Sequence, residues 1–128
     1  MKIRWLDEPE EHDYPAAADY LSLLFTGVEV GNLINALKAE PVRTRKAKDI
    51  LRASGLPALP PGNVHVGKDL AKAKAGKALS PILLVRGQPL LVADGYHRVC
   101  ASYVLSEDED IPCKLVSFPW RNPDVQSP

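Results

Sequence analysis

Apolar residues recur at helical spacing through the first part of the chain. The first stripe begins after Asp13, which is expected to cap a helix, and extends to Val28. A second stripe runs from Val30 to Leu37. The helix that it predicts ends before Pro41, because the residue that precedes a proline disfavours helical geometry. We therefore expect two helices in this part of the chain.

A third helix is predicted over residues 43–54, with Gly55 as its C-terminal stop. Its apolar positions would face inward and its basic residues outward, at Arg43, Arg45, Lys46, Lys48 and Arg52. Residues 56–62 hold three prolines and a glycine, so we expect a rigid connector there. Residues 1–60 are interpreted as a helical N-terminal extension.

The second part of the chain alternates short apolar runs with turn residues. The elements that we expect are a short helix, two strands, a helix and a strand, over residues 68–77, 82–86, 90–93, 96–105 and 111–116. Gly87-Gln88-Pro89 would join the first two strands as a hairpin, and residues 118–128 would form an irregular tail. This order predicts an α+β fold in which helices flank a small mixed β-sheet. A chain of 128 residues is expected to form a single domain.

The charges of the chain cancel overall but are segregated along it. With 16 basic and 16 acidic residues, the chain lacks the basic excess that a generic polyphosphate binder carries. Residues 1–29 hold seven acidic and two basic side chains, whereas residues 43–77 hold nine basic and two acidic ones. Such segregation can steer an anionic ligand to one face. Alternatively, the oppositely charged segments pair across the surface.

Membrane insertion and cysteine chemistry find no support in the sequence. The longest apolar runs, Ile82–Val85 and Leu90–Ala93, are too short to cross a bilayer, and no secretory signal opens the chain. Cys100 and Cys113 belong to no Cys-x-x-Cys pair, so no zinc or thioredoxin-like motif is present. We expect two reduced, buried thiols, a cytoplasmic location, no membrane partner and no metal-ligating residues.

The candidate chemistry lies in the stretch Leu-Val-Ala-Asp-Gly-Tyr-His-Arg that ends at Arg98. An apolar strand ends at Asp94-Gly95 and passes at once into a helix whose first turn holds Tyr96, His97 and Arg98. A helix start exposes unpaired N–H groups and the positive end of the helix dipole. Gly95 would let a ligand approach the backbone, and the His and Arg side chains add donors, so we predict a compact anion site. The alternative is that Arg98 pairs with Asp94 or the acidic loop at 107–110, with His97 a surface residue.

Four features follow one another in residues 80–117: a Pro-Ile strand, a hairpin, a Gly-x-x-Arg helix start, and a closing strand with a proline beside its entry. In the order and spacing of these features, and more loosely from residue 63, the chain resembles the ParB/sulfiredoxin-like superfamily. The resemblance implies a nucleotide whose phosphates lie at the helix start. Gly95, His97 and Arg98 would contact them, together with the N–H of Tyr96, and Lys68 would add a contact from the preceding basic helix.

Departures from the superfamily separate its branches. Sulfiredoxins attack oxidised peroxiredoxin with a cysteine, and this chain has Tyr96 at that position, so the nucleophile is missing. The partitioning proteins bind CTP and attach a helix-turn-helix domain, for which the eleven residues after position 117 leave no room. The Asp-Gly-x-x-Arg signature of the ADP-dependent free-serine kinases is satisfied by Asp94, Gly95 and Arg98.

Three hypotheses of function follow. The first is a protein that binds a nucleotide or another phosphate ligand, as a phosphotransferase or nucleotide hydrolase that uses Mg²⁺ with ATP, ADP or CTP. Asp94 and His97 would then be catalytic, the former orienting Mg²⁺ or a hydroxyl nucleophile and the latter carrying a proton. The second is a non-catalytic nucleotide-sensing or protein-interaction module, in which the N-terminal helices form a partner or homodimer surface. The third is DNA binding through the basic residues predicted on the third helix.

Overall fold

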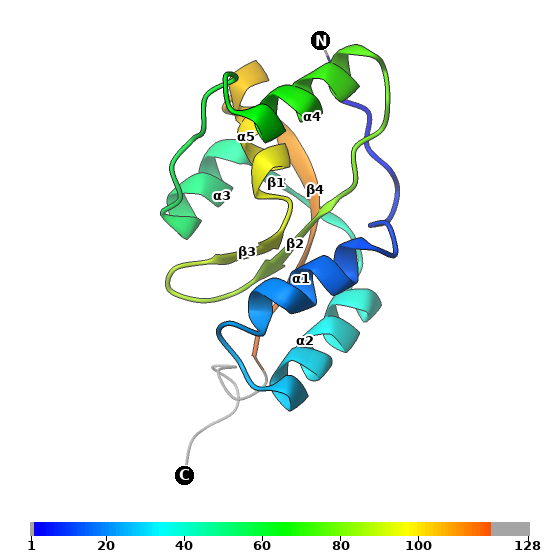
Figure 1. Ribbon diagram of the computed structural model, residues 1–128, viewed down its shortest axis with the longest axis vertical. Helices are drawn as coiled ribbons and strands as arrows, with labels where there is room; N and C mark the ends of the chain where they lie inside the picture. Colours follow the sequence, from blue (N-terminus) through cyan, green and yellow to red (C-terminus); the bar gives the residue numbers. More distant parts are fainter. Residues whose placement is uncertain (1, 119–128) are drawn as a thin grey trace.

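The structure is a computed structural model that describes residues 2–118. These residues form five helices and four strands (Figure 1). The helices are α1 (Asp13–Leu21), α2 (Gly27–Ala39), α3 (Ala47–Ser54), α4 (Val64–Lys74) and α5 (Tyr96–Leu105). The strands are β1 (Arg43–Lys46), β2 (Ile82–Val85), β3 (Leu91–Asp94) and β4 (Asp110–Val116).

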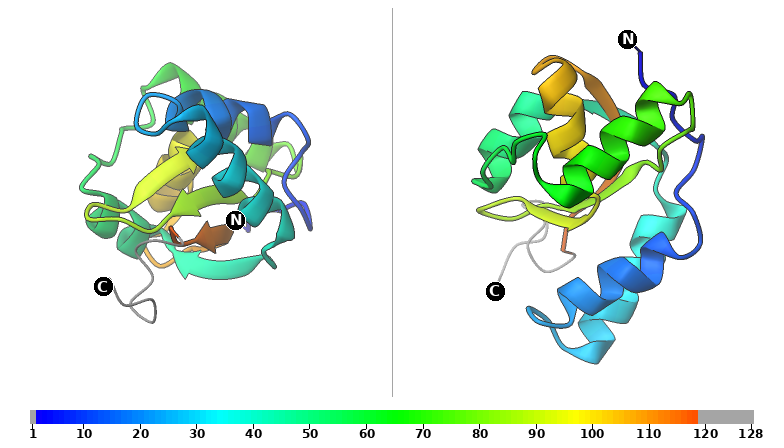
Figure 2. Two further views of the ribbon diagram at one scale, coloured as in Figure 1. Left: turned by 90° about the horizontal axis from the view of Figure 1, so that it is seen from below. Right: turned by 45° about the horizontal axis from the view of Figure 1, so that its top comes forward.

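The four strands make one sheet in the order β1-β4-β2-β3. The central pair, β2 and β4, is parallel, whereas β1 with β4 and β2 with β3 are antiparallel. Helices α1 and α2 lie on one side of the sheet, and α3, α4 and α5 lie on the other (Figures 1 and 2). The structure therefore has the α+β fold with a small mixed sheet that the sequence predicts.

Alternation along the strands produces two apolar cores, one on each face of the sheet. Ile82 and Leu84 of β2 pack with residues of α3, α4 and α5, whereas Leu83 and Val85 pack with residues of α1 and α2. Both faces are covered, so β2 is a continuous apolar run in which all four residues are buried. The first two helices thus share a core with the sheet.

Residues 43–54, predicted as one helix, are divided between a strand and a helix. Arg43 pairs with Cys113 and Lys46 with Asp110 in an antiparallel ladder between β1 and β4, and α3 begins only at Ala47. The prediction was wrong because the pairing partner lies far away in the chain. The end of the helix is as predicted, since Gly55 follows it with a φ of 68°.

The predicted first helix was too long. Helix α1 ends at Leu21, and Val28, assigned to its apolar stripe, belongs to α2 and has 77% of its surface exposed. Helix α2 begins after Thr26, whose side chain accepts a hydrogen bond from the N–H of Glu29 while the Glu29 carboxylate accepts one from the N–H of Thr26. This capping box starts a new helix inside the predicted one.

Asp13 is the first residue of α1 and not its cap. Its buried carboxylate accepts hydrogen bonds from the N–H of Glu10 and the hydroxyl of Ser80, which lies just before β2. Asp13 therefore ties the N-terminal segment to the sheet. A polar side chain with this role is not distinguishable from an N-cap by local sequence.

The second part of the chain follows the prediction more closely. The β2–β3 hairpin forms, α5 occupies the predicted range, and β4 begins one residue earlier than expected. Helix α4 starts at Val64, four residues before the predicted helix, because the Asn63 side chain accepts hydrogen bonds from the N–H groups of His65 and Val66. Phe118, assigned to the tail, is buried and its ring lies 4.5 Å from that of Phe25. The rest of the predicted tail lies outside the described residues.

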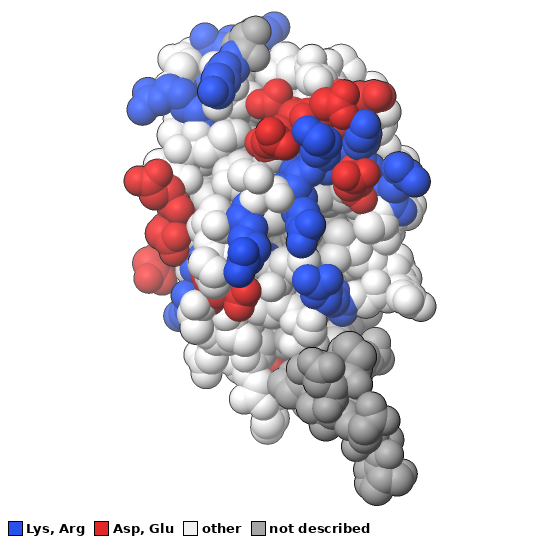
Figure 3. All heavy atoms as spheres, turned by 180° about the vertical axis from the view of Figure 1, so that it is seen from behind, with Lys and Arg blue, Asp and Glu red and all other residues white. Residues whose placement is uncertain are grey.

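Acidic and basic side chains lie next to one another on the surface (Figure 3). Lys46 pairs with Asp110 at 3.2 Å and Lys48 with Asp108 at 2.6 Å, and the ammonium of Lys114 lies 3.0 Å from a carboxylate oxygen of Glu8. Lys46 and Lys48 thus pair with the acidic loop at 107–110, and Glu8 pairs with a lysine of β4. Among residues 2–118 no salt bridge joins residues 1–29 to residues 43–77, so the predicted pairing of those two segments was wrong. The basic helix face on which the DNA-binding hypothesis depended was a wrong prediction, because Arg43, Arg45 and Lys46 stand on β1.

Cys100 and Cys113 are both free and buried, as expected. In the part of the chain that the structure describes, no helix has the length and apolar character needed to traverse a bilayer.

Candidate functional site

The turn from β3 into α5 is built around Gly95, the N-cap of the helix, with a φ of 105°. A Cβ at this position would lie 2.4 Å from Cγ2 of Ile82 and 2.9 Å from Nη2 of Arg98. The sequence predicts a glycine that admits a ligand, but the space that its missing side chain leaves is filled from within the protein. Glycine is therefore required by the backbone conformation and the core, irrespective of a ligand.

The first turn of α5 presents unpaired N–H groups. Within residues 2–118 no acceptor is found for the N–H groups of Tyr96, His97 and Arg98, and the first bonded one is that of Val99, which donates to the carbonyl of Gly95 at 3.0 Å. The helix has ten residues, so the positive end of its dipole coincides with these three donors. This end of α5 is suited to an anion.

A pocket of about 240 Å³ lies against this helix start. It is lined by all of the candidate residues from the sequence: Lys68, Asp94, Gly95, Tyr96, His97 and Arg98. The remaining wall is His65, Asp69 and Lys72 of α4, three residues that the sequence analysis did not select. Their spacing of three to four residues, with Lys68 between them, places them on one helix face. That spacing was the available signal: Asp69 and Lys72 lie within the helix predicted over residues 68–77, and only His65 falls before its predicted start.

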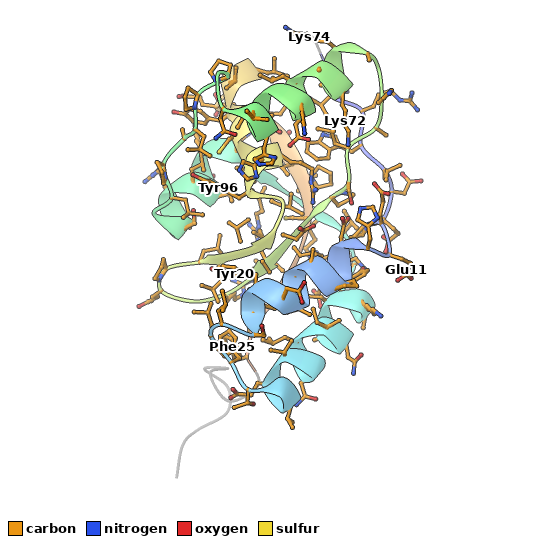
Figure 4. All side chains as sticks on the ribbon, viewed as in Figure 1. Glu11, Tyr20, Phe25, Lys72, Lys74 and Tyr96 are labelled. Carbon is orange, nitrogen blue, oxygen red and sulfur yellow. The ribbon has the colours of Figure 1, made fainter. Side chains whose placement is uncertain are left out.

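Figure 4 labels Lys72 on α4 and Tyr96 at the start of α5, the two helices that enclose the pocket. The hydroxyl of Tyr96 donates to the carbonyl of Pro57 in the connector before α4. This hydroxyl therefore binds the connector and is not available to a ligand. The group of Tyr96 that can bind an anion is its backbone N–H. The thiol nearest in sequence, Cys100, is buried, and burial raises its pKa, so no reactive cysteine compensates for the tyrosine.

Two imidazoles meet across the pocket. The rings of His65 and His97 have centroids 4.7 Å apart, at an interplanar angle of 43°. Burial lowers the pKa of His97, the neighbouring His65 lowers it further, and Asp69 opposes both. The neutral imidazole of His97 consequently predominates at pH 7, and a bound anion would favour its protonation.

Arg98 pairs with Asp94, as the alternative hypothesis predicted. Nη2 of Arg98 lies 3.0 Å from Oδ2 of Asp94 and 3.5 Å from the carbonyl oxygen of Pro81. The two side chains are only 17% and 18% exposed, and Nε of Arg98 is buried with no hydrogen-bond partner among residues 2–118. The guanidinium therefore holds the turn together, and a ligand in the pocket would contact it from its remaining side.

The carboxyl groups of the pocket are in an unfavourable environment for their charge. Burial raises the pKa of Asp94 although Arg98 opposes the effect, and burial likewise raises the pKa of Asp69. Asp94 does not cap α5, because the cap is Gly95 and no side-chain bond is made there. Across residues 2–118 no group of three or more His, Cys, Asp or Glu side chains is arranged to hold a metal ion.

Comparisons with protein-family models, with curated proteins and with solved structures find no match for this chain.

Proposed function

We propose that the protein binds a phosphate-bearing small molecule, of which a nucleotide is the first candidate, with its phosphates at the start of α5. The observation that supports this proposal most directly is the set of three unpaired N–H groups of residues 96–98 facing Lys68 and Lys72 across one pocket. Main-chain donors at a helix start, combined with flexible ammonium groups, are a recurrent way to bind phosphate.

The pocket is large enough to hold the phosphates of a nucleotide but too small to enclose the whole molecule. A volume of about 240 Å³ is smaller than the roughly 300–1,000 Å³ of pockets that enclose a drug-sized molecule. We therefore expect the phosphates to enter and the remainder of a nucleotide to lie on the surface between α4 and the connector. Mg²⁺ would accompany the phosphates of ATP, ADP or CTP, because the side chains of residues 2–118 do not by themselves form a metal site.

The geometry of the pocket supports ligand binding more strongly than it supports catalysis. Phosphoryl transfer needs a group that orients or deprotonates the nucleophile, and Asp94, which the sequence nominates, is held by Arg98. His97 lines the pocket as a neutral imidazole and is the better candidate for a proton acceptor. Non-catalytic nucleotide sensing is the second candidate function, and the Asp94–Arg98 pair is the observation that favours it.

Direct titration of the full chain with ADP, ATP, CTP and pyrophosphate, with and without Mg²⁺, tests the proposal. Lys68→Gln and Lys72→Gln should each weaken binding about fivefold, the equivalent of about 1 kcal/mol for a partly exposed ion pair. The matched control is Lys74→Gln, an exposed lysine of the same helix that does not line the pocket. Absence of saturable binding by all four ligands, or an equal loss in the control, would contradict the proposal.

The pH dependence of anion binding is a second test. Because binding of an anion favours the protonated form of His97, the complex takes up a proton, and affinity should increase as the pH falls from 8 to 6. Sulfate is the suitable probe, since its own charge is constant over this range. The increase should disappear in His97→Gln, and a pH dependence that survives this substitution would assign it to another group.

A further inference from the structure

A second and larger pocket, of about 700 Å³, lies between α3 and the β2–β3 hairpin. It shares no lining residue with the pocket at the start of α5. Its volume falls within the range of about 300–1,000 Å³ that is usual for small-molecule sites. A ligand here would be independent of the phosphate ligand proposed above.

The floor of this second pocket is apolar. It is made by Ile50 of α3 and Leu84 of β2, both buried in the core, with the partly buried Leu90 and Leu115 beside them. The walls are held in place by main-chain bonds that cross between elements. The N–H of Leu90 donates to the carbonyl of Ala53 at 2.9 Å, which attaches the hairpin to the end of α3. The pocket is therefore formed before a ligand arrives.

Two arginines line the pocket together with its apolar residues. Arg45 of β1 and Arg86, which follows β2, both line the pocket, and neither side chain makes an ion pair or hydrogen bond with any of residues 2–118. The third charged residue of the lining, Asp49, faces Arg52 at 3.8 Å. Most other cations near β1 are matched, since Lys46 and Lys48 pair with acidic side chains. At an apolar cavity, Arg45 and Arg86 thus place positive charge that no side chain within residues 2–118 compensates.

From this combination we infer a binding site for an amphipathic organic acid. The apolar body of the ligand lies against Ile50, Leu84 and Leu115, and its acid group pairs with one of the two guanidinium groups that line the pocket, Arg45 or Arg86. Guanidinium groups bind carboxylates and related oxyanions through paired N–H donors, and adjacent apolar surface strengthens such contacts by excluding water. A neutral apolar ligand would bury the same surface but leave both cations without a partner.

The experiment is a fluorescence titration of the full chain with 8-anilinonaphthalene-1-sulfonate, an aromatic sulfonate whose emission increases in apolar surroundings. We expect saturable binding to one site and displacement by decanoate, but not by decanol at the same concentration. Arg45→Gln or Arg86→Gln, whichever removes the guanidinium that pairs with the acid group, should weaken binding about tenfold, as expected when a charge-assisted hydrogen bond is lost. If neither substitution weakens binding, the inference is wrong. Arg43→Gln is the matched control, because this exposed arginine of β1 does not line the pocket.

A substitution that fills the cavity distinguishes binding in this cavity from binding to other apolar surface. Ala53 is exposed and lines the pocket, so Ala53→Phe should fill the cavity without disturbing the core, and should abolish binding while the thermal unfolding of the free protein is unchanged. Lys68→Gln should have no effect, which distinguishes the site from the phosphate pocket. Displacement by decanol as efficient as by decanoate, or unchanged binding in Ala53→Phe, would overturn the inference. So would a dimer that dissociates in Ala53→Phe, since a second copy would then be the occupant.

Discussion

Replacement of Gly95 by alanine tests whether the turn into α5 is as tightly constrained as its geometry indicates. The added Cβ would stand 2.4 Å from Cγ2 of Ile82, a distance at which one of the two groups must move. Ile82 is fully buried in the sheet, so it has little room to yield. The backbone contributes a second cost, because a φ of 105° is a conformation that residues with a side chain rarely adopt.

The two costs can be estimated separately. Backbone strain of this kind is worth about 1–3 kcal/mol, and forcing an extra carbon into a packed core costs about 1–3 kcal/mol. Alanine also reduces the entropy of the unfolded chain, which returns about 0.4–1 kcal/mol. We therefore expect Gly95→Ala to lower the free energy of unfolding by about 1–6 kcal/mol, a large share of the roughly 5–15 kcal/mol of a typical domain.

Two other glycines provide matched controls. Gly55 has a φ of 68°, but within residues 2–118 no atom beyond its two chain neighbours lies within 4 Å of the point where an alanine methyl group would stand, so Gly55→Ala should cost only the backbone strain, about 1 kcal/mol. Gly31 lies inside α2 with ordinary geometry and open space around it. Gly31→Ala should stabilise the protein by about 0.5–1 kcal/mol, because alanine is a better helix former.

The measurement is urea denaturation followed by circular dichroism, with the free energy of unfolding obtained by linear extrapolation. The order of stability should be Gly31→Ala, wild type, Gly55→Ala and Gly95→Ala, from highest to lowest. If Gly95→Ala costs no more than Gly55→Ala, Ile82 and Arg98 do not crowd the turn and the packing argument is refuted.

Three further predictions concern buried ionisable groups. Lys114→Met should lower the free energy of unfolding by about 1–2 kcal/mol, because the buried ammonium donates to the carbonyl of Lys38 at 3.1 Å and pairs with Glu8; an unchanged urea midpoint would show that these bonds only offset the cost of burial. Asp69→Asn should stabilise the protein at pH 7, because burial raises the pKa of Asp69 and the folded state therefore disfavours its charge; the gain should vanish in urea titrations well below the ordinary pKa of 3.8, where the carboxyl is protonated in both states. Cys100 and Cys113 should resist Ellman's reagent at pH 8 in the folded protein and react after unfolding in urea, since burial raises the pKa of Cys113 to about 11 and leaves about one thiol in a thousand ionised; rapid reaction of the folded chain would contradict their burial.

Local signals in the sequence were sufficient where an element depends on neighbouring residues. Helix α5 and the β2–β3 hairpin were predicted because apolar spacing and turn residues lie within the elements themselves. The candidate residues at positions 94–98 were predicted for the same reason, since the strand, the glycine and the helix start are contiguous. The structure places them in one pocket with Lys68, and their role in binding an anion stays a prediction.

The strand β1 shows what local signals could not provide. Four residues, three of them basic, precede a helix and have no apolar alternation of their own. They are a strand because β4, more than sixty residues later, offers a free edge to which their backbone bonds. An isolated sequence carries no record of such an edge, so the basic residues were assigned to the following helix.

By itself, then, the chain's sequence determined an α+β fold, the hairpin, and a run of donors where β3 passes into α5. The pair of Asp94 and Arg98 spans only four residues, and the sequence offered it as one of two alternatives. Only the tertiary structure decided that α4 supplies His65, Asp69 and Lys72 to the same pocket, and that Gly95 is required by Ile82. The physical reason is the separation along the chain of the residues that interact. Hydrogen bonds within a turn or helix join residues three or four positions apart, whereas packing, ion pairing and pocket walls join residues that only the folded chain brings together.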